Sequence, residues 1–278
     1  MTNSGTRPQE VADFYDGSSR LIAELNGGSL HFGCWDSLPA DAGMDRASQR
    51  LTEMMTERIE VGPGQRVLDI GCGTGAPAVQ LARATGAEVV GITISPEQVR
   101  LATAHAEREG VAERVTFRCA DASAELPFPA DSFDAVWFFE SIFHLPDRLT
   151  ALRRAAEVLR PGGRLALTDV LHNDETSPAA QESLDEHAYT PLVGEPMRLS
   201  DYPPLLRQAR LVPVECRDIS ELTVGRTLEC MHRTLDENRE RFVERYGSEL
   251  VDQFSTAVPL LDAVEFGYGI VTAARPDH

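Results

Sequence analysis

The chain has 278 residues, of which 42% are hydrophobic and 25% charged, an ordinary composition for a globular protein built around one large core. Acidic residues outnumber basic ones by 44 to 26, no lysine occurs, and the formal net charge is -18. Binding to nucleic acid or to an anionic membrane surface depends on basic side chains, so this balance argues against both kinds of partner.

The cysteines and the chain's apolar runs point to a reduced, aqueous compartment. The five cysteines form no CxxC pair and no metal-ligand spacing, which favours free thiols and predicts no metal site. We see neither a run of roughly 20 apolar residues that could span a membrane nor the apolar segment of a signal peptide. We therefore expect a cytoplasmic protein, and its oligomeric state stays open.

Along the chain, the first strong pattern is a helix. Apolar residues recur at helical spacing over 44–59, and the sequence VGPGQ then ends the helix. Strands and helices alternate from there, as at 95–108, where Ser95 is the expected N-cap and Pro96 lies in the first turn. We predict strands at 66–71, 88–95, 114–121, 134–140 and 164–171. Strands separated by helices of this length form a parallel, doubly wound sheet.

Beyond residue 171 the pattern changes. Residues 174–200 are polar with scattered prolines, a sixth strand is expected at 212–220, and helices fill 222–262 before a last strand at 266–275. The predicted fold is α/β: a doubly wound, seven-stranded, mostly parallel sheet with a helical lid. We expect three parts: an N-terminal helical segment that closes over a ligand (1–60), the core (61–221 and 263–278), and the lid (222–262).

The sequence VLDIGCGTGAP (67–77) follows a strand and opens a helix, which is the context of a nucleotide-binding turn. Its glycines at 71, 73 and 75 form GxGxG rather than GxGxxG, and Asp69 lies just before them. The acid that holds the ribose in dinucleotide sites is missing after the next strand, which argues against a dehydrogenase. A carboxylate beside the turn suits a ligand with an amino group and a sulfonium better than a pyrophosphate.

With that turn, the sequence resembles class I S-adenosylmethionine-dependent methyltransferases. The sequences CADASAELPFPADSFDAVWFFES and RAAEVLRPGGRLALTDV match later motifs, so the resemblance covers 66–171. FYDGSSRLIAELNGGSLHFGCW and FGYGIVTAAR extend it and point to the subgroup that methylates bacterial natural products, similar to the rebeccamycin sugar O-methyltransferase. The resemblance implies a Rossmann-like methyltransferase fold, S-adenosyl-L-methionine as cofactor, and a role in natural-product or antibiotic biosynthesis.

The resemblance also implies which positions hold the cofactor. The glycine turn would take its methionyl and ribose parts, residues after the second strand its ribose, and residues after the third strand its adenine. The implied cofactor-binding residues are Tyr15, His31, Asp69, Gly71, Gly73, Thr93, Gln98, Asp121, Ala122 and Glu140. For three of them a structural role is the alternative to cofactor binding. Tyr15 would pack in the core, His31 would be a capped surface imidazole, and Glu140 would be purely structural instead of making backbone contacts to the cofactor.

The sequence FFESIFHLPD (138–147) places a histidine where a buried strand ends. In a parallel sheet, ligands bind outside the carboxyl ends of the strands, so His144 and Asp169, at the end of the next strand, are expected to meet there. A histidine held by a carboxylate is a good general base, and we predict this pair to be catalytic. The resembled sugar methyltransferases carry two adjacent histidines here, whereas this chain has Phe143 in place of the first. The alternative is that His144 caps a helix and Asp169 binds backbone amides.

The predicted activity is methyl transfer from S-adenosylmethionine to a hydroxyl of a small secondary metabolite, with a sugar hydroxyl as one candidate. One alternative is C-methylation of a prenyl or aromatic carbon, for which Tyr15, Trp35 and Phe143 could form a cation-tolerant pocket. The other is a cyclase that binds the cofactor without transferring its methyl group. The identity of the small-molecule acceptor stays open.

Overall fold

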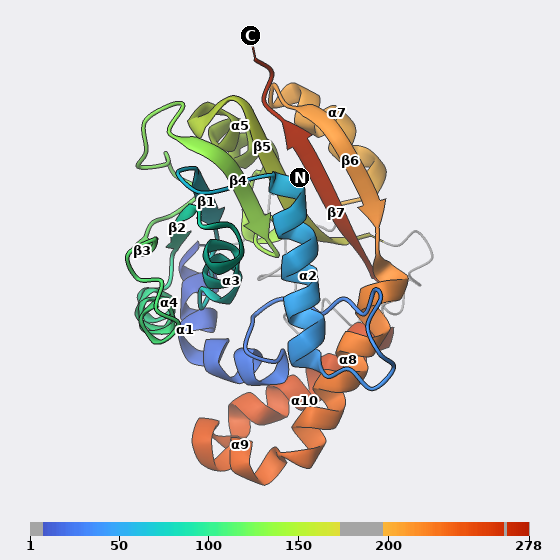
Figure 1. Cartoon of the computed structure of the whole chain (residues 1–278). Helices are drawn as coiled ribbons and strands as arrows, with labels where there is room; N and C mark the ends of the chain where they lie inside the picture. The colour runs from blue at the N-terminus through green and yellow to red at the C-terminus, as the bar shows by residue number, and fades with distance from the viewer. Residues whose placement is uncertain (1–7, 173–196, 264–265, 278) are drawn as a thin grey trace.

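The computed structural model describes residues 8–172, 197–263 and 266–277, and its centre is one β-sheet (Figure 1). The strand order is β3-β2-β1-β4-β5-β7-β6. The strands are β1 (Arg66–Ile70), β2 (Glu88–Thr93), β3 (Val115–Cys119), β4 (Phe133–Phe139), β5 (Leu159–Leu171), β6 (Val212–Asp218) and β7 (Gly267–Ala274). β7 is antiparallel to β5 and β6, and the other pairs are parallel. The predicted doubly wound, seven-stranded, mostly parallel sheet is confirmed.

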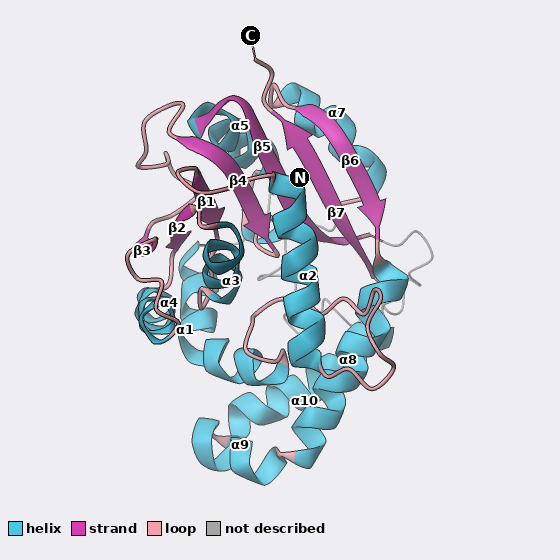
Figure 2. Ribbon diagram, viewed as in Figure 1, coloured by secondary structure: helices cyan, strands magenta, loops and turns pink. Residues whose placement is uncertain are grey.

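Helices cover both faces of this sheet (Figure 2). They are α1 (Pro8–Leu25), α2 (Met44–Ile59), α3 (Ala76–Thr85), α4 (Pro96–Arg108), α5 (Arg148–Val158), α7 (Tyr202–Gln208), α8 (Ser220–Glu237), α9 (Arg239–Tyr246) and α10 (Ser248–Ala263), with 3₁₀ turns η1 (Ile142–His144) and η2 (Leu199–Asp201). The helices predicted at 44–59 and 95–108 form as expected. The stretch predicted as helical at 222–262 is divided into α8, α9 and α10. Most of the polar segment 174–200 lies outside the described residues.

Among the element ends that differ from the sequence prediction, two have clear local reasons. The strand expected at 88–95 stops at Thr93, because the Ser95 hydroxyl accepts a hydrogen bond from the Gln98 backbone N–H (3.0 Å) and so begins α4. The strand expected at 164–171 begins earlier, at Leu159, and includes the RPGG sequence. There Gly162 adopts φ 76°, which favours glycine.

The core has a layer on each face of the sheet. Consecutive residues of β4 alternate between the layers, as expected for a strand: Phe138 packs in one cluster, and Trp137 and Phe139 pack in the other. Because both faces are covered, β4 is apolar from Ala135 to Phe139, and the next polar side chain, Glu140, appears only where the strand ends. The carboxyl end of β4 is therefore the point at which polar chemistry can begin.

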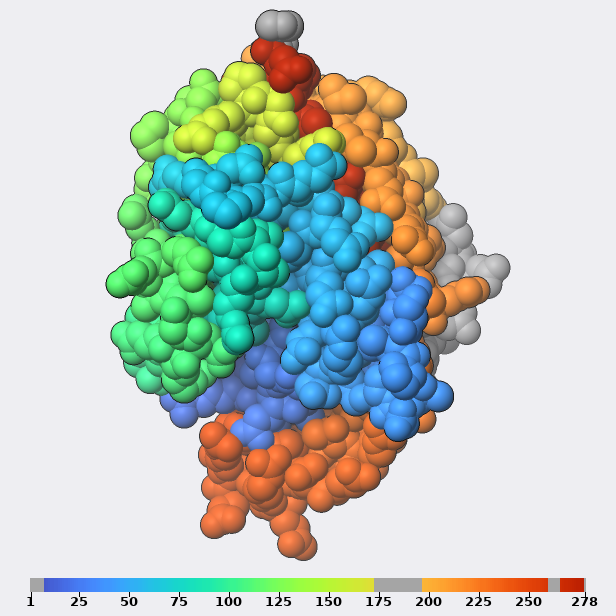
Figure 3. Space-filling view, in the orientation of Figure 1, coloured from blue at the N-terminus to red at the C-terminus, as the bar shows by residue number. Residues whose placement is uncertain are grey.

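A third hydrophobic cluster lies away from the sheet. Leu21 and Leu25 of α1 pack against Leu228 of α8, Phe242 of α9 and Phe254 of α10. Figure 1 shows β4 pointing toward this group of helices, and Figure 3 shows α8–α10, in orange, next to the blue N-terminal segment. α1 is thus held beyond the carboxyl ends of the parallel strands. The division into an N-terminal segment, core and lid stays a prediction.

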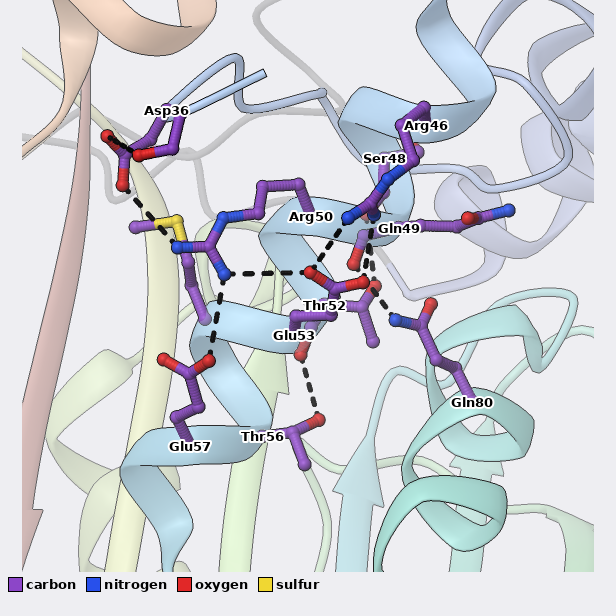
Figure 4. Close-up of polar contacts among 12 residues, drawn as sticks. Asp36, Arg46, Ser48, Gln49, Arg50, Thr52, Glu53, Thr56, Glu57 and Gln80 are labelled. Carbon is purple, nitrogen blue, oxygen red and sulfur yellow. Dashed lines mark hydrogen bonds and ion pairs between the residues drawn. The ribbon is translucent and has the colours of Figure 1, made fainter. Parts of the chain in front are cut away.

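The loop between α1 and α2, residues 26–43, is called the strap below. Ion pairs on the outer face of α2 hold its far end: Arg50 contacts Asp36 of the strap at 3.5 Å, and also Glu53 and Glu57 at 3.6 Å each (Figure 4). These side chains are partly exposed, so each pair stabilises the fold by less than about 1 kcal/mol. Of these pairs, Arg50–Asp36 joins the strap to α2, and the other two lie within α2.

Among the described residues, no helix combines the length and the apolar character needed to cross a membrane.

Candidate active site

A pocket lies at the carboxyl ends of β1, β2, β3 and β4, where the strand order of the sheet reverses between β1 and β4. Residues of α1 and the strap form the wall opposite these strand ends. This is the position at which doubly wound sheets bind their ligands. All ten residues predicted to hold the cofactor line this pocket, and so does His144. Asp169 does not line it and is fully buried. The structure thus brings eleven of the twelve predicted site residues to one place, and their individual roles remain predictions.

The glycine turn between β1 and α3 forms the floor of the pocket. Gly71 and Gly73 have φ values of 80° and 52°, which side-chain-bearing residues rarely adopt. A Cβ on Gly71 would lie 2.3 Å from Ser141 Cβ, and one on Gly73 would lie 2.8 Å from Leu30 Cδ1. The turn is therefore pressed between the tip of β4 and the strap, and only glycine fits at these two positions.

Asp69, the last but one residue of β1, is almost fully buried in the pocket wall. Neither of its carboxylate oxygens has a hydrogen-bond partner within the described part of the chain. Burial raises the pKa of Asp69 to about 7, and the nearby Trp137 indole has a smaller, opposite effect without reaching hydrogen-bond geometry itself. An unpaired buried carboxylate is costly, so this residue suits a ligand that brings hydrogen-bond donors or positive charge.

The ends of β2 and β3 present the polar groups predicted for ribose and adenine. Thr93 Oγ1 donates to Gln98 Oε1 at 2.5 Å, and Gln98 Nε2 donates to Ser19 Oγ on α1 at 3.0 Å. This chain of bonds ties α1 to the tip of β2. At the end of β3, Asp121 Oδ1 accepts hydrogen bonds from the Ser123 N–H and hydroxyl at 2.7 and 2.6 Å. The local turn fixes the Asp121 side chain and leaves Oδ2 without a partner among the described contacts.

His31, on the strap, is buried rather than on the surface, so the alternative of a capped surface imidazole is wrong. Its ring stacks on Phe139 with centroids 4.1 Å apart. Nδ1 lies 2.7 Å from the Phe32 carbonyl oxygen and must donate to it, so Nε2, 3.2 Å from Thr52 Oγ1, is the accepting nitrogen. Burial lowers the pKa of His31 to about 4, so the ring is neutral and joins the strap to α2 and to the sheet.

Glu140 follows β4 with φ 47°, an uncommon conformation for a residue with a side chain. Its Oε1 accepts hydrogen bonds from the Phe32 backbone N–H at 2.6 Å and from the Tyr268 hydroxyl, and its own N–H donates to Thr168 Oγ1 at 3.0 Å. Burial is the main reason that the pKa of Glu140 rises to about 7, with a smaller contribution from Asp169. The carboxylate therefore joins the strap, β4 and β7 at the edge of the pocket.

His144 ends the 3₁₀ turn after β4 and faces α1. Its Nε2 lies 2.8 Å from the Tyr15 hydroxyl, and the two rings meet edge to face with centroids 5.3 Å apart. Burial and, to a lesser degree, the Glu140 charge raise the pKa of the Tyr15 phenol, so this phenol stays neutral. The Phe143 ring lies beside the imidazole, with centroids 4.2 Å apart. Tyr15 is thus a polar partner of His144 and not merely a core residue.

The direct contact expected between His144 and Asp169 is not formed in the described part of the chain. The Asp169 carboxylate is taken by two other residues: Oδ2 accepts from the Tyr202 hydroxyl and lies 3.4 Å from an Arg148 guanidinium nitrogen. Burial raises the pKa of Asp169 to about 6, and Arg148 opposes that rise. The ends of β4 and β5 are neighbours, as the strand order predicted. However, Tyr202 in the first turn of α7 binds Asp169, and the 3₁₀ turn η1 points His144 toward α1.

Comparison with known proteins shows which family the chain belongs to. A model described as a methyltransferase domain matches residues 68–167. Methyltransferase GfsG of Streptomyces halstedii is 35% identical, over 96% of this chain and 95% of its own length. The 27-O-demethylrifamycin SV methyltransferase of Amycolatopsis mediterranei is 38% identical, over 97% and 98%. The chain belongs to the S-adenosylmethionine-dependent methyltransferases.

A solved structure shares the fold over nearly the whole chain. The crystal structure of the [4+2]-cyclase SpnF superposes with a TM-score of 0.84 at 30% identity, covering 99% of this chain and 98% of that one. The comparisons confirm the predicted family and S-adenosylmethionine as the cofactor. Similarity to the rebeccamycin sugar O-methyltransferase stays a prediction.

The methyltransferase pocket fits this cofactor. The unpaired buried carboxylate of Asp69 suits the ammonium of the methionyl part, and the glycine turn leaves room for backbone to approach the ligand. Asp121 keeps an oxygen free for a hydrogen-bond donor such as an adenine amino group. The residues present therefore match the cofactor's chemistry at both of its ends.

Sequence reasoning missed three residues of the methyltransferase site. Tyr268 binds Glu140, Phe32 supplies the strap's N–H, and Tyr202 holds Asp169. FGYGIV was recognised as a family motif, but nothing in it shows which acid its tyrosine meets. All three lie more than thirty residues from their partners, and only the fold pairs them.

Proposed function

We propose that this methyltransferase transfers a methyl group to a hydroxyl of a small secondary metabolite, with His144 as the general base. One observation carries the proposal: His144 lines the cofactor pocket at the tip of β4, with Nε2 at 2.8 Å from the Tyr15 hydroxyl. The relatives' names, which include a demethylrifamycin methyltransferase, support a natural-product acceptor. A sugar hydroxyl is the finer expectation drawn from the sequence resemblance.

When bound, S-adenosylmethionine supplies an electrophilic methyl group on a positively charged sulfur. The chain's own residues then have two tasks. Asp69 and the glycine turn hold the cofactor. His144 Nε2 exchanges its contact with the Tyr15 hydroxyl for the acceptor hydroxyl, and takes the proton that this hydroxyl loses as its oxygen attacks. A base so placed typically contributes about 10²–10⁴-fold in rate. Until the acceptor binds, Tyr15 fixes the plane of the imidazole, a positioning effect that prepares the attack geometry.

The proposed role of Asp169 differs from the one predicted from the sequence. Because its carboxylate is bound to Tyr202 and Arg148, we propose that it shapes the acceptor side of the site through those two residues rather than through a hydrogen bond to His144.

The test is His144→Ala, measured as S-adenosylhomocysteine produced with a panel of glycosides, phenols and hydroxylated polyketides. We expect kcat to fall at least about 100-fold while the Kd for S-adenosylhomocysteine is unchanged. His232→Ala is the matched control, because that histidine lies exposed on α8 beside Asp236. If His144→Ala turns over as fast as wild type, the base assignment fails and an activated or carbon acceptor becomes the better proposal.

Two alternatives respond differently to the same assay. The similarity to SpnF gives weak support to a cyclase that binds the cofactor without using it, and such a protein would form no S-adenosylhomocysteine with any acceptor. The carbon methyltransferase needed an aromatic pocket made by Tyr15, Trp35 and Phe143. Trp35 instead packs beside Met44 and Cys230, and neither it nor Phe143 lines the pocket, which weakens that alternative.

A further inference from the structure

The cofactor pocket is lined by two acids that lack a cationic partner, the buried Asp69 and the half-buried Glu140. None of the ion pairs within the described residues involves either carboxylate. Withdrawing a carboxylate from water without a positive charge nearby is costly, fully so for Asp69 and in part for Glu140. A ligand that brings positive charge to both acids would offset that cost.

The two acids line the pocket from two neighbouring strands, β1 and β4. Asp69 is at the glycine-turn end, next to Cys72, whose thiol pKa is raised by burial and, to a lesser degree, by the Asp69 charge. Glu140 is at the strand-four end, near Tyr15, whose phenol contacts His144 and has its pKa raised by burial and then by the Glu140 charge. One acid is therefore beside the glycine turn, and the other is beside the partner of the proposed base.

The two oxygens of the Glu140 carboxylate differ: one accepts hydrogen bonds from the chain, and the other can still accept a ligand. Oε1 accepts from the Phe32 N–H and from the Tyr268 hydroxyl, whereas Oε2 has no partner among the described hydrogen bonds. The left-handed backbone at Glu140 and its N–H bond to Thr168 Oγ1 fix where the side chain begins. Strained conformations of this kind persist where the surrounding structure holds them for a purpose.

The cofactor carries two positive charges, an ammonium and a sulfonium. During methyl transfer the carbon–sulfur bond breaks, its electron pair stays on sulfur, and the methyl group bonds to the acceptor oxygen, whose proton goes to the base. S-adenosylhomocysteine therefore keeps the ammonium and has a neutral thioether. The pocket's two acids match the two charges of the substrate form, and only one of them matches a charge of the product form.

We propose that Glu140 is a specificity-determining residue that recognises the sulfonium charge, so that the pocket distinguishes S-adenosylmethionine from S-adenosylhomocysteine electrostatically. Asp69 binds the ammonium, which both forms share. The assignment extends the role of Glu140 beyond backbone contact and gives the enzyme a way to release its product, because the Glu140 carboxylate loses its counter-charge when the methyl group leaves. It rests on the cofactor alone and is independent of which acceptor is methylated.

The test is calorimetric binding to Glu140→Gln of three ligands: S-adenosylmethionine, S-adenosylhomocysteine, and sinefungin, which carries an amine in place of the methylated sulfur. Glutamine retains an oxygen for the Phe32 N–H and the Tyr268 hydroxyl, so the strap stays in place. We expect the Kd values of the two charged ligands to rise about tenfold, and that of S-adenosylhomocysteine to change less than about twofold.

Two variants make the result specific. Asp69→Asn is expected to weaken all three ligands alike, because each carries the ammonium. Glu88→Gln removes a charge from an exposed acid at the start of β2 and is expected to change none of them. Unchanged binding of S-adenosylhomocysteine also shows that Glu140→Gln is folded.

Two results would overturn the inference. Equal loss of all three ligands in Glu140→Gln would mean that the residue only holds the strap, and no loss of any ligand would mean that its charge is unused. Failure of the proposed function is a separate result: the charged ligands would still be distinguished, while no hydroxyl acceptor would be methylated.

Discussion

The glycine-turn end of the pocket and its strand-four end are built in different ways. At the first, Asp69, Gly71 and Gly73 lie within eleven consecutive residues, and backbone geometry does most of the work. At the second, Tyr15, Glu140 and His144 come from α1 and from the tip of β4, and hydrogen bonds between distant segments hold them. The first end is a local motif on a rigid sheet, whereas the second exists only when the strap and α1 are in place.

Of the three variants discussed, Gly71→Ala is expected to have the largest effect, a loss of folding stability. It tests whether the glycine-turn end is rigid. Its Cβ would overlap Ser141 Cβ at 2.3 Å on a left-handed backbone, so we expect a loss of about 3 kcal/mol or more in the free energy of unfolding. Gly64→Ala is the matched control, because Gly64 has φ 81° and nothing within 4 Å. Urea unfolding of both variants separates the steric cost from the backbone cost, and equal losses would show that the turn is not pressed against β4.

Asp69→Asn is expected to raise the free energy of unfolding of the ligand-free protein, a smaller change than that of Gly71→Ala and of opposite sign. Since the folded-state pKa is raised to about 7, the protonated form favours folding at low pH, and that stability is lost as pH rises through about 7. Asparagine imitates the protonated form, so the variant should gain on the order of 2 kcal/mol over wild type at pH 8 and nothing near pH 4. Thermal unfolding across that range checks this, and a variant no more stable than wild type at pH 8 would show that Asp69 is already compensated.

The smallest effect is expected from Tyr15→Phe, which tests the strand-four end. Removing the hydroxyl takes away the hydrogen bond between Tyr15 and the His144 imidazole, and we expect kcat to fall about tenfold while the Kd for S-adenosylhomocysteine stays the same. Tyr246→Phe is the control, since its hydroxyl donates to Glu24 of α1 away from the pocket. A fall in cofactor affinity as large as the fall in kcat would mean that Tyr15 belongs to the cofactor end.

These two ends also differ in what could be predicted. The sheet, the glycine turn and the cap at Ser95 follow from local patterns, because each depends on residues close together in the chain. The pairing of His144 with Asp169 was inferred from strand order alone, and strand order does not say where a side chain turns after the strand ends. Tyr202 took the Asp169 carboxylate because α7 begins against the tip of β5.

The sequence alone determined the fold class, the methyltransferase family, the cofactor and the set of residues around the pocket, because these depend on periodicity and short motifs. Only the tertiary structure decided that His31 is buried and neutral, that His144 meets Tyr15, and that Glu140 joins Phe32 to Tyr268. Such contacts join segments more than a hundred residues apart in two of the three cases, and they form only when packing brings those segments together. Burial then sets the protonation of each group, which no local pattern of residues can show.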